Sequence, residues 1–295
     1  MKTNIKGGGV ALITPFKDSG EIDFEALERL LNRVISGGAD YLVVLGTTAE
    51  TPTLSAEERI AVTKFVIEKN NGKLPIVLGI GGNCTADVVR SIQTTDLEGV
   101  DAILSVTPYY NKPSQEGIYQ HYKTIAEASP RPIVMYNVPG RTGVNMAAAT
   151  TLRLAHECKN IIAVKEASGN IAQAAYILRD RPEGFYVISG DDNLTLPMMA
   201  MGGDGVISVA VNAYPEKFCR MVHALQQGDV KTAASLHLEM MEATDALFAE
   251  GNPVGVKAVL TYYGVIRNNL RLPLVASSAA LDARLKNLIE RYDLK

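Results

Sequence analysis

The chain has 295 residues, of which 47% are hydrophobic and 21% charged, and its net charge at pH 7 is −3. This length suits one barrel-sized domain with a large core, and the composition is that of an ordinary globular protein. The weak negative charge offers no basic footprint for nucleic acid or an anionic membrane surface. No apolar stretch has the length needed to span a bilayer, and the N-terminus lacks the apolar core of a signal peptide.

Cysteines and histidines narrow the chemistry further. The cysteines are scattered and odd in number, at Cys84, Cys158 and Cys219, which fits a reducing cytoplasm and no disulfide framework. The histidines lie far apart in helix-like segments, and none has a histidine partner four residues on. We therefore expect a cytoplasmic protein without a metal centre.

Short apolar runs alternate with amphipathic segments along most of the chain. The apolar runs predict eight strands, at 9–14, 41–45, 76–78, 102–106, 133–137, 161–165, 186–189 and 205–209. Amphipathic periodicity predicts helices between them, at 23–36, 55–70, 85–98, 114–129, 146–156, 171–180 and 194–201. Ser55 and Glu58 have the spacing of a capping box at the second helix.

This alternation predicts an α/β fold, a closed (β/α)8 barrel. An open doubly wound sheet is the competing architecture, but the segment 15–20 after the first strand has no GxGxxG fingerprint. Beyond about residue 225 the strands stop, and 229–250, 253–263 and 278–292 are helix-like. We predict a catalytic barrel over 1–227 and a C-terminal helical extension over 228–295.

Lys165 is the most informative residue. It ends the apolar run Ile161–Val164, which is typical of a strand buried on both faces. A lysine at the C-terminal end of a barrel strand projects into the mouth of the barrel, where barrel enzymes do their chemistry. Burial favours the neutral amine, which can attack a keto group and form a Schiff base. The alternative is a strand-end lysine that reaches out to solvent.

Other strand ends carry polar groups with two interpretations each. After the second strand, Gly46-Thr47-Thr48 could hold a carboxylate through hydroxyl and backbone N–H groups, or form an ordinary capped turn. The glycine-rich turn at 79–83 could cradle a phosphate, although a plain tight turn is favoured. The segment Asp191-Asp192-Asn193 could bind a metal ion, but no third acidic ligand is evident and helix capping is favoured.

Two further strand-end loops carry tyrosines and an arginine. The loop after the fourth strand contains Tyr109 and Tyr110, and the fifth strand leads into Tyr136 and Arg141. Tyrosines are common packing residues at barrel rims. Near a reactive lysine, however, a tyrosine hydroxyl can transfer the protons that Schiff-base chemistry needs, and an arginine can hold a carboxylate with its two-pronged guanidinium.

The motifs GTTAE at 46–50, TPYYNKP at 107–113, YNVPGRTG at 136–143 and VKEASG at 164–169 together resemble the dihydrodipicolinate synthase (4-hydroxy-tetrahydrodipicolinate synthase) family. The resemblance covers essentially the whole chain, from ITPF at 13–16 onward. It implies condensation of pyruvate with aspartate-β-semialdehyde in diaminopimelate and lysine biosynthesis. It also implies a (β/α)8 barrel, commonly a homotetramer, and no metal or organic cofactor.

The resemblance assigns a role to each matching residue. Lys165 corresponds to the Schiff-base lysine for pyruvate, and the proton relay corresponds to Tyr136, Thr47 and Tyr110, the last donated by a neighbouring subunit in the family. The residues that correspond to substrate-binding positions are Thr48 for the pyruvate carboxylate, Arg141 for the semialdehyde, and Gly190 and Ile207 in the pocket lining. Ala49 departs from the family, which usually has glycine there.

The resemblance also suggests a lysine effector site at a subunit interface. Its positions correspond to Thr51, Asn83, Asp87 and Tyr109, together with Ala56 and Arg59, which replace histidines of some sensitive members. Asp87 could pair with an amino group of the effector, or it could simply be a solvated charge in the first turn of a helix. We therefore expect inhibition by L-lysine.

Two alternative functions stay open. Another pyruvate-dependent lyase, such as a sialic acid or keto-deoxy-sugar aldolase, could use the same scaffold, because specificity resides on the loops. A non-catalytic barrel that binds a small acid as a sensor is the more distant alternative. Lys165 and Tyr136 argue against a sensor, and Arg141 in its YNVPGRTG context favours the synthase.

Overall fold

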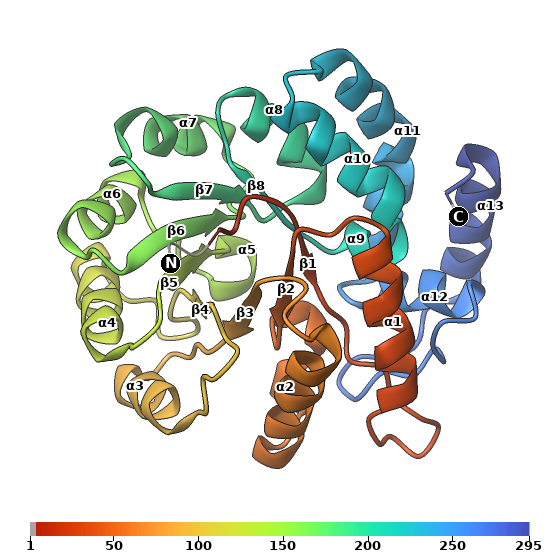
Figure 1. Cartoon of the computed structure of the whole chain (residues 1–295), viewed down its shortest axis with the longest axis horizontal. Helices are drawn as coiled ribbons and strands as arrows, with labels where there is room; N and C mark the ends of the chain where they lie inside the picture. Colours follow the sequence, from red (N-terminus) through yellow and green to blue (C-terminus); the bar gives the residue numbers. More distant parts are fainter. Residues whose placement is uncertain (1–3, 295) are drawn as a thin grey trace. The chain divides into compact units, whose positions relative to one another are not determined.

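The computed structural model describes residues 4–294. Its parallel strands follow one another in a closed barrel in the order β1 to β8 (Figure 1). The strands are short and almost wholly buried, which explains their continuous apolar sequences. Their bounds are β1 (Gly7–Ala11), β2 (Tyr41–Val44), β3 (Ile76–Gly79), β4 (Ala102–Val106), β5 (Ile133–Asn137), β6 (Ile161–Glu166), β7 (Tyr186–Ser189) and β8 (Gly205–Ser208). The predicted (β/α)8 barrel is confirmed.

Helices separate the strands. Up to β8 they are α1 (Phe24–Ser36), α2 (Ala56–Asn70), α3 (Thr85–Thr94), α4 (Gln115–Ala128), α5 (Pro139–Thr142), α6 (Ala148–Glu157), α7 (Ile171–Asp180) and α8 (Thr195–Ala200). Three short 3₁₀ helices lie among them, η1 (Thr47–Ala49), η2 (Thr51–Thr53) and η3 (Asp192–Leu194). The capping box of α2 is confirmed, since Ser55 accepts the Glu58 N–H and the Glu58 side chain accepts the Ser55 N–H.

Five further helices follow β8. They are α9 (Ala210–Ala213), α10 (Pro215–Gln226), α11 (Val230–Phe248), α12 (Val254–Tyr262) and α13 (Ala279–Tyr292). The last three agree closely with the predicted C-terminal helices. Over residues 4–294, no helix combines the length and apolar character that a membrane crossing requires.

The chain forms two compact units. The first comprises Pro75–Ile207 with the described residues before Gly7, and the second comprises Gly7–Leu74 with the described residues from Ser208 onward. The first unit therefore carries the strands from β3 to β7 and β8 up to Ile207. The second carries β1, β2 and all the helices after β8.

In the first unit, parallel pairing fixes which residues lie side by side. Tyr136 on β5 is in register with Lys165 on β6, which is in register with Ile188 on β7. Register partners on neighbouring parallel strands point to the same face of the sheet. Outside these strands, α4 packs beside α6, and α6 beside α7 (Figure 1).

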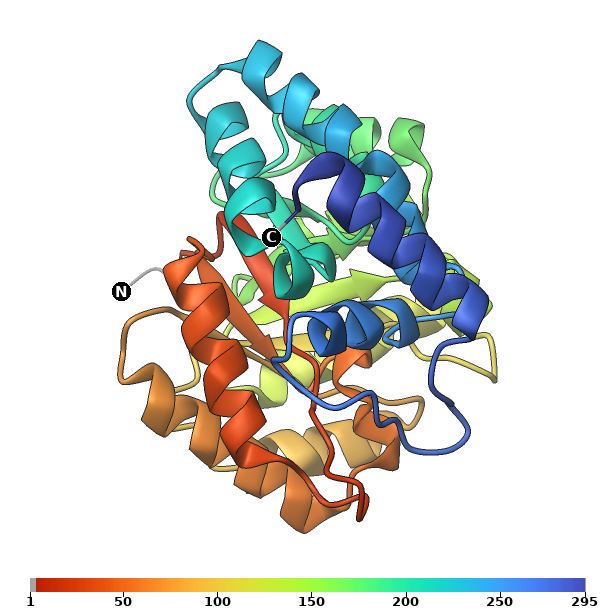
Figure 2. The same cartoon turned by 90° about the vertical axis from the view of Figure 1, so that its right-hand side faces the viewer.

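In the second unit, β1 pairs with β2, and the C-terminal helices pack on one another. Figure 2 shows the dark blue helix α13 beside the lighter blue α11, and the two are in contact.

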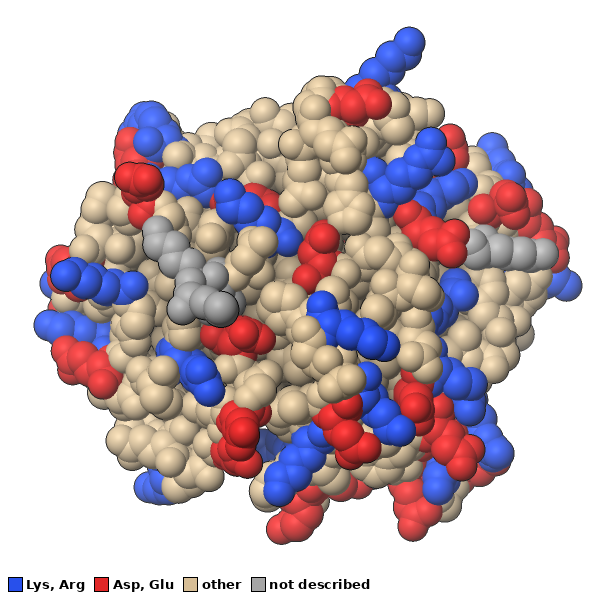
Figure 3. Space-filling model, viewed as in Figure 1, with Lys and Arg blue, Asp and Glu red and all other residues tan. Residues whose placement is uncertain are grey.

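On the face of the molecule shown in Figure 3, basic and acidic side chains are intermixed. That face therefore presents no basic track of the kind that binds nucleic acid.

Candidate active site

Lys165 lies at the end of β6 in the first unit, and only 7% of its surface is exposed. Its Nζ atom lies 4.3 Å from the centre of the Tyr136 ring, over the ring face. The alternative of a lysine that reaches out to solvent is therefore wrong. A buried amine next to a tyrosine has the two groups that imine formation needs, a nucleophile and a proton carrier.

Hydrogen bonds to its backbone carbonyl hold Tyr136 in place. The Tyr136 carbonyl accepts hydrogen bonds from the backbone N–H and the hydroxyl of Thr107, both at 2.9 Å. Behind it, the fully buried Tyr122 donates its hydroxyl to the Ser105 carbonyl at 2.8 Å. Burial raises the pKa of Tyr122, so this hydroxyl remains a donor. The β4 and β5 ends are thereby fixed beside the lysine.

Gly190 and Ile207 also lie in the first unit. The Gly190 N–H donates to the Glu166 carbonyl at 2.8 Å, just after β7 ends. A Cβ atom on Gly190 would lie 3.0 Å from Lys165 Cε, so the absence of a side chain makes room for the lysine. Ile207 is buried on β8.

Arg141 is exposed and lies in α5, within the loop that follows β5. At the start of this loop Asn137 donates to the buried Glu166, the residue after Lys165, and at its return Asn145 donates to Gln173, which itself donates to Glu166. Sequence reasoning did not single out Glu166. The available signal was a second charged residue directly after Lys165, at the end of an apolar run.

The loop after β4 projects outward. Tyr110 is 87% exposed and has a φ of 74°, a left-handed backbone conformation that is unusual for a tyrosine. Asn83 donates its side-chain amide to the Tyr109 carbonyl at 3.2 Å, so these two predicted effector residues are brought together. Asp87 is exposed and pairs instead with Arg90 on the same helix, at 2.9 Å.

The threonine pair lies in the second unit, on η1. Thr47 is exposed and Thr48 is 3% exposed. Asn252 donates its side-chain amide to Thr48 Oγ1 at 2.9 Å. Because an amide nitrogen only donates, the Thr48 hydroxyl keeps its own proton for another acceptor. Ala49 accommodates its methyl group in η1 without a positive φ, so the departure from glycine causes no backbone strain.

A buried charged cluster, the Glu50–Lys257 pair, supports this loop within the second unit. Glu50 has a left-handed backbone, with a φ of 55°, and its carboxylate pairs with the fully buried Lys257. Its other oxygen accepts the Arg271 N–H at 3.0 Å. Burial lowers the pKa of Lys257 to about 8, and the Glu50 carboxylate limits that decrease. The sequence signal was one lysine inside an apolar helix.

The other candidate sites have structural explanations. At the 79–83 turn, a Cβ on Gly81 would lie 2.9 Å from the Val106 backbone nitrogen, so this glycine permits close packing on β4. Asp191 accepts the Asn193 N–H at 3.1 Å and caps η3. Both observations favour the turn and the cap over a phosphate or metal site.

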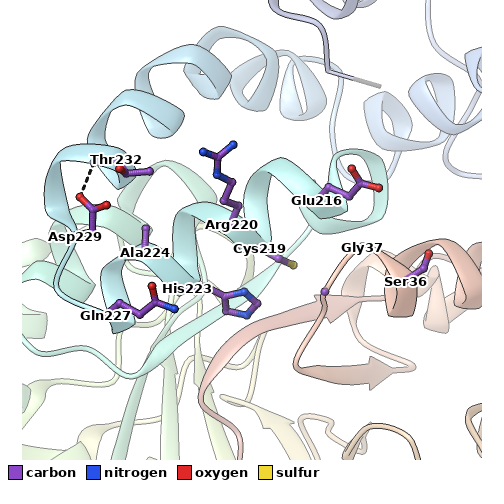
Figure 4. Close-up of a pocket in the computed structure, with 11 residues that line it drawn as sticks. Ser36, Gly37, Glu216, Cys219, Arg220, His223, Ala224, Gln227, Asp229 and Thr232 are labelled. Carbon is purple, nitrogen blue, oxygen red and sulfur yellow. Dashed lines mark hydrogen bonds between the residues drawn. The ribbon is translucent and has the colours of Figure 1, made fainter.

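An open hollow of about 490 Å³ lies between α1 and α10 in the second unit. In Figure 4, Cys219 and His223 extend from α10 toward the turn at Gly37. This turn precedes β2, whereas Thr47 and Thr48 follow β2. Barrel enzymes react at the C-terminal ends of their strands. The hollow therefore lies at the wrong end of β2 for the reaction.

The fold and the buried lysine define a class, the barrel enzymes that use a lysine amine against a carbonyl substrate. A family model described as the dihydrodipicolinate synthetase family matches residues 4–292, and the chain belongs to that family. A 4-hydroxy-tetrahydrodipicolinate synthase from Parabacteroides distasonis is 54% identical over 292 residues, which cover 99% of this chain and 98% of the relative.

Solved structures agree with this assignment. A monomeric dihydrodipicolinate synthase variant is 40% identical, with a TM-score of 0.96 over 98% of this chain and 97% of its own. The synthase from Cyanidioschyzon merolae with lysine bound is 38% identical, with a TM-score of 0.94 over 98% and 99% of the two chains. The likeness thus covers the barrel and the C-terminal helices alike.

Proposed function

We propose that this chain condenses pyruvate with aspartate-β-semialdehyde through a Schiff base on Lys165, giving 4-hydroxy-tetrahydrodipicolinate for diaminopimelate and lysine biosynthesis. The observation that supports this most directly is the buried Lys165 amine, in register with Tyr136 and 4.3 Å from the centre of its ring. The choice of the two substrates is based on membership of the dihydrodipicolinate synthetase family.

The reaction follows from these groups. The Lys165 amine attacks the keto carbon of pyruvate, and Tyr136 transfers protons as water leaves and the imine forms. Loss of a methyl proton gives an enamine, whose carbon attacks the aldehyde carbon and forms the new C–C bond. The amino group of the second substrate then attacks the imine carbon and releases Lys165. A covalent intermediate that forms before the second substrate reacts gives ping-pong kinetics.

The remaining roles are proposed from family membership. Thr47 and Tyr110 complete the proton relay with Tyr136, and Thr48 binds the pyruvate carboxylate. The hydroxyl proton that Asn252 leaves free on Thr48 is suited to that acceptor. Arg141 binds the carboxylate of the semialdehyde through its guanidinium. Gly190 and Ile207 line the pocket.

Borohydride trapping tests the central step. Pyruvate and borohydride should leave a reduced adduct on the peptide that contains Lys165, located by mass spectrometry. Lys165→Ala should abolish the adduct, whereas Lys159→Arg, which changes an exposed lysine just before β6, should retain it. An adduct on another lysine, or none, contradicts the proposal.

A coupled assay tests the second substrate. The synthase should turn over aspartate-β-semialdehyde after pyruvate. A different pyruvate-dependent lyase would pass the trapping test and fail this assay.

We further propose a homotetrameric assembly in which Tyr110 acts in the site of a neighbouring subunit. The support is the 87% exposure of Tyr110 on a strained loop, since an aromatic side chain there can be buried by a partner. Mixing Tyr110→Phe with Lys165→Ala protomers should then restore part of the activity. If activity stays absent after sizing confirms subunit exchange, Tyr110 serves its own subunit.

L-Lysine is proposed as a feedback inhibitor that binds near Tyr109, Asn83 and Thr51. The Asn83 bond to the Tyr109 carbonyl supports a preformed patch. The Asp87–Arg90 pair makes Asp87 the weakest member of the set. Lysine titrated at saturating substrate concentrations should inhibit, with a weakened response in Asn83→Ala. A flat response in the unaltered enzyme rejects the site.

We also propose a cytoplasmic location, consistent with the exposed free thiol of Cys84.

A further inference from the structure

Glu166 is a buried carboxylate whose hydrogen-bond partners are neutral. It follows Lys165 on β6 and is 3% exposed. Its Oε1 accepts the Ser168 N–H at 2.7 Å, and its Oε2 accepts the Gln173 side-chain amide at 3.0 Å. The Asn137 amide donates to both oxygens, at 3.3 and 3.1 Å. A buried charge is tolerated when donors of this kind surround it.

The carboxylate determines how both amides are oriented. Because an ionised carboxylate only accepts, Asn137 and Gln173 must turn their NH₂ groups toward Glu166 and their oxygens away. The Asn137 Oδ1 then accepts the Met146 N–H at 2.9 Å, and the Gln173 Oε1 accepts the Asn145 side-chain amide at 2.8 Å. The Glu166 carboxylate thus orients the two amides so that their oxygens accept hydrogen bonds from Asn145 and Met146.

These hydrogen bonds close the loop that carries Arg141. The loop begins at Asn137, the last residue of β5, and returns at Asn145 and Met146. Gln115 of α4 also binds the end of the loop, because its side-chain amide donates to the Asn145 carbonyl at 2.8 Å. The exposed Arg141 therefore stands on a loop whose two ends are fixed to one buried cluster.

We propose that Glu166 and Gln173 are positioning residues for Arg141, and that they determine how well the enzyme selects a second substrate bearing a carboxylate. The inference rests on the proposed role of Arg141. The guanidinium must be held in place to bind a carboxylate with two parallel hydrogen bonds, and a freely moving loop would lose this geometry. Glu166 and Gln173 act through the loop and touch no substrate.

A double-mutant cycle tests this. Gln173→Ala should lower kcat/KM for the semialdehyde about tenfold, mainly through KM, and leave the rate of pyruvate trapping within about twofold. In an Arg141→Ala background the same substitution should cost less than about twofold, since the group it positions is absent. Glu166→Gln should behave like Gln173→Ala, because it places an NH₂ group against the donors that the carboxylate binds. Gln120→Ala, which removes an exposed glutamine bond to Glu116, is the matched control and should change nothing.

The outcomes separate the two levels of the proposal. If Arg141→Ala leaves kcat/KM for the semialdehyde unchanged, the proposed role of Arg141 fails. If Arg141→Ala lowers it strongly but the effects of Arg141→Ala and Gln173→Ala multiply in full, the positioning role is wrong and the role of Arg141 stands. Equal loss of trapping and turnover in Gln173→Ala also overturns the positioning role. Should Glu166→Gln fold poorly, the Gln173→Ala cycle still decides.

Discussion

At the scale of single residues, the space beside Lys165 depends on a glycine. We predict that Gly190→Ala slows pyruvate trapping about tenfold, the effect of a modest steric clash. The new Cβ would lie 3.0 and 3.1 Å from Lys165 Cε and Cγ, and 2.6 Å from Ala167 Cβ. The lysine would therefore have to leave its place over Tyr136. Single-turnover borohydride trapping measures this rate directly.

Gly140→Ala is the control, because a Cβ there meets no atom within 4 Å. It should trap pyruvate at the rate of the unaltered enzyme. If Gly190→Ala also traps at that rate, the glycine does not shape the lysine site. A loss in both variants would indicate a general effect of alanine in these loops.

The sequence singled out Lys165 but not its surroundings. Strand-end position and residue type made Lys165 a candidate, the family resemblance added Tyr136, and the register of the two strands shows that these residues are neighbours. Glu166 was not singled out, because strand alternation places it on the opposite side from Lys165. Its amide partners Asn137 and Gln173 come from separate segments, and nothing local in the sequence links their side chains to it.

At the scale of elements, a buried histidine joins α4 to the start of α3. His121 is 4% exposed, and its Nδ1 lies 2.8 Å from Thr85 Oγ1. Its Nε2 has no hydrogen-bond partner among the described residues. Protonation would bury a charge and an unpaired N–H together, and burial lowers the pKa of His121 from 6.5 to about 4.

We predict that this histidine makes the fold sensitive to acid. The unfolded chain binds the proton near pH 6.5 and the folded chain only near pH 4, so the free energy of unfolding falls as pH decreases between these values. The loss should approach about 3 kcal/mol at most. His121→Asn, which keeps an amide near Thr85, should flatten this dependence. Urea unfolding from pH 7 to pH 4.5, at one protein concentration, measures it.

His156→Asn is the control, because His156 is exposed. It should leave the pH dependence of unfolding as it is. An unchanged slope in His121→Asn would assign the acid sensitivity to other groups.

Helices with local start signals were predicted well. α2 and α4 begin after Ser55 and Ser114 as expected, and α7 has its predicted bounds. The sequence pattern predicts no element over 210–226, yet this segment forms α9 and α10. Neither has a side-chain cap, and α9 is wholly buried, so its residues show no amphipathic period. α5 was missed because four residues are too few for periodicity.

At the scale of the whole molecule, eight predicted strands with helices between them were enough to predict the barrel. The boundary proposed at residue 227 rests on that repeat pattern. In the folded chain, the described residues from Ser208 onward belong to the same compact unit as Gly7–Leu74, an association between distant parts of the sequence that no local signal reveals. We therefore propose that the helices from 228 onward are an integral part of the fold.

The buried Glu50–Lys257 pair joins these distant segments. We predict that Lys257→Met lowers the free energy of unfolding by about 3 to 5 kcal/mol, because it leaves the Glu50 carboxylate buried without its cation. The double variant Glu50→Gln with Lys257→Met should lose less than the sum of the two single variants, since both charges are then gone. Urea unfolding of the full chain measures all three.

Lys286→Met is the matched control, because Lys286 and Glu290 form an exposed pair on α13 at 4.0 Å. Its free energy of unfolding should fall by less than about 1 kcal/mol.

The Glu50–Lys257 pair also bears on activity, because Glu50 directly follows η1 and has a left-handed backbone there. Lys257→Met should therefore weaken pyruvate binding at Thr48 even at temperatures where the protein remains folded. Full additivity in the double variant, with normal pyruvate binding in Lys257→Met, would mean that the ion pair neither joins the two segments nor shapes the threonine loop.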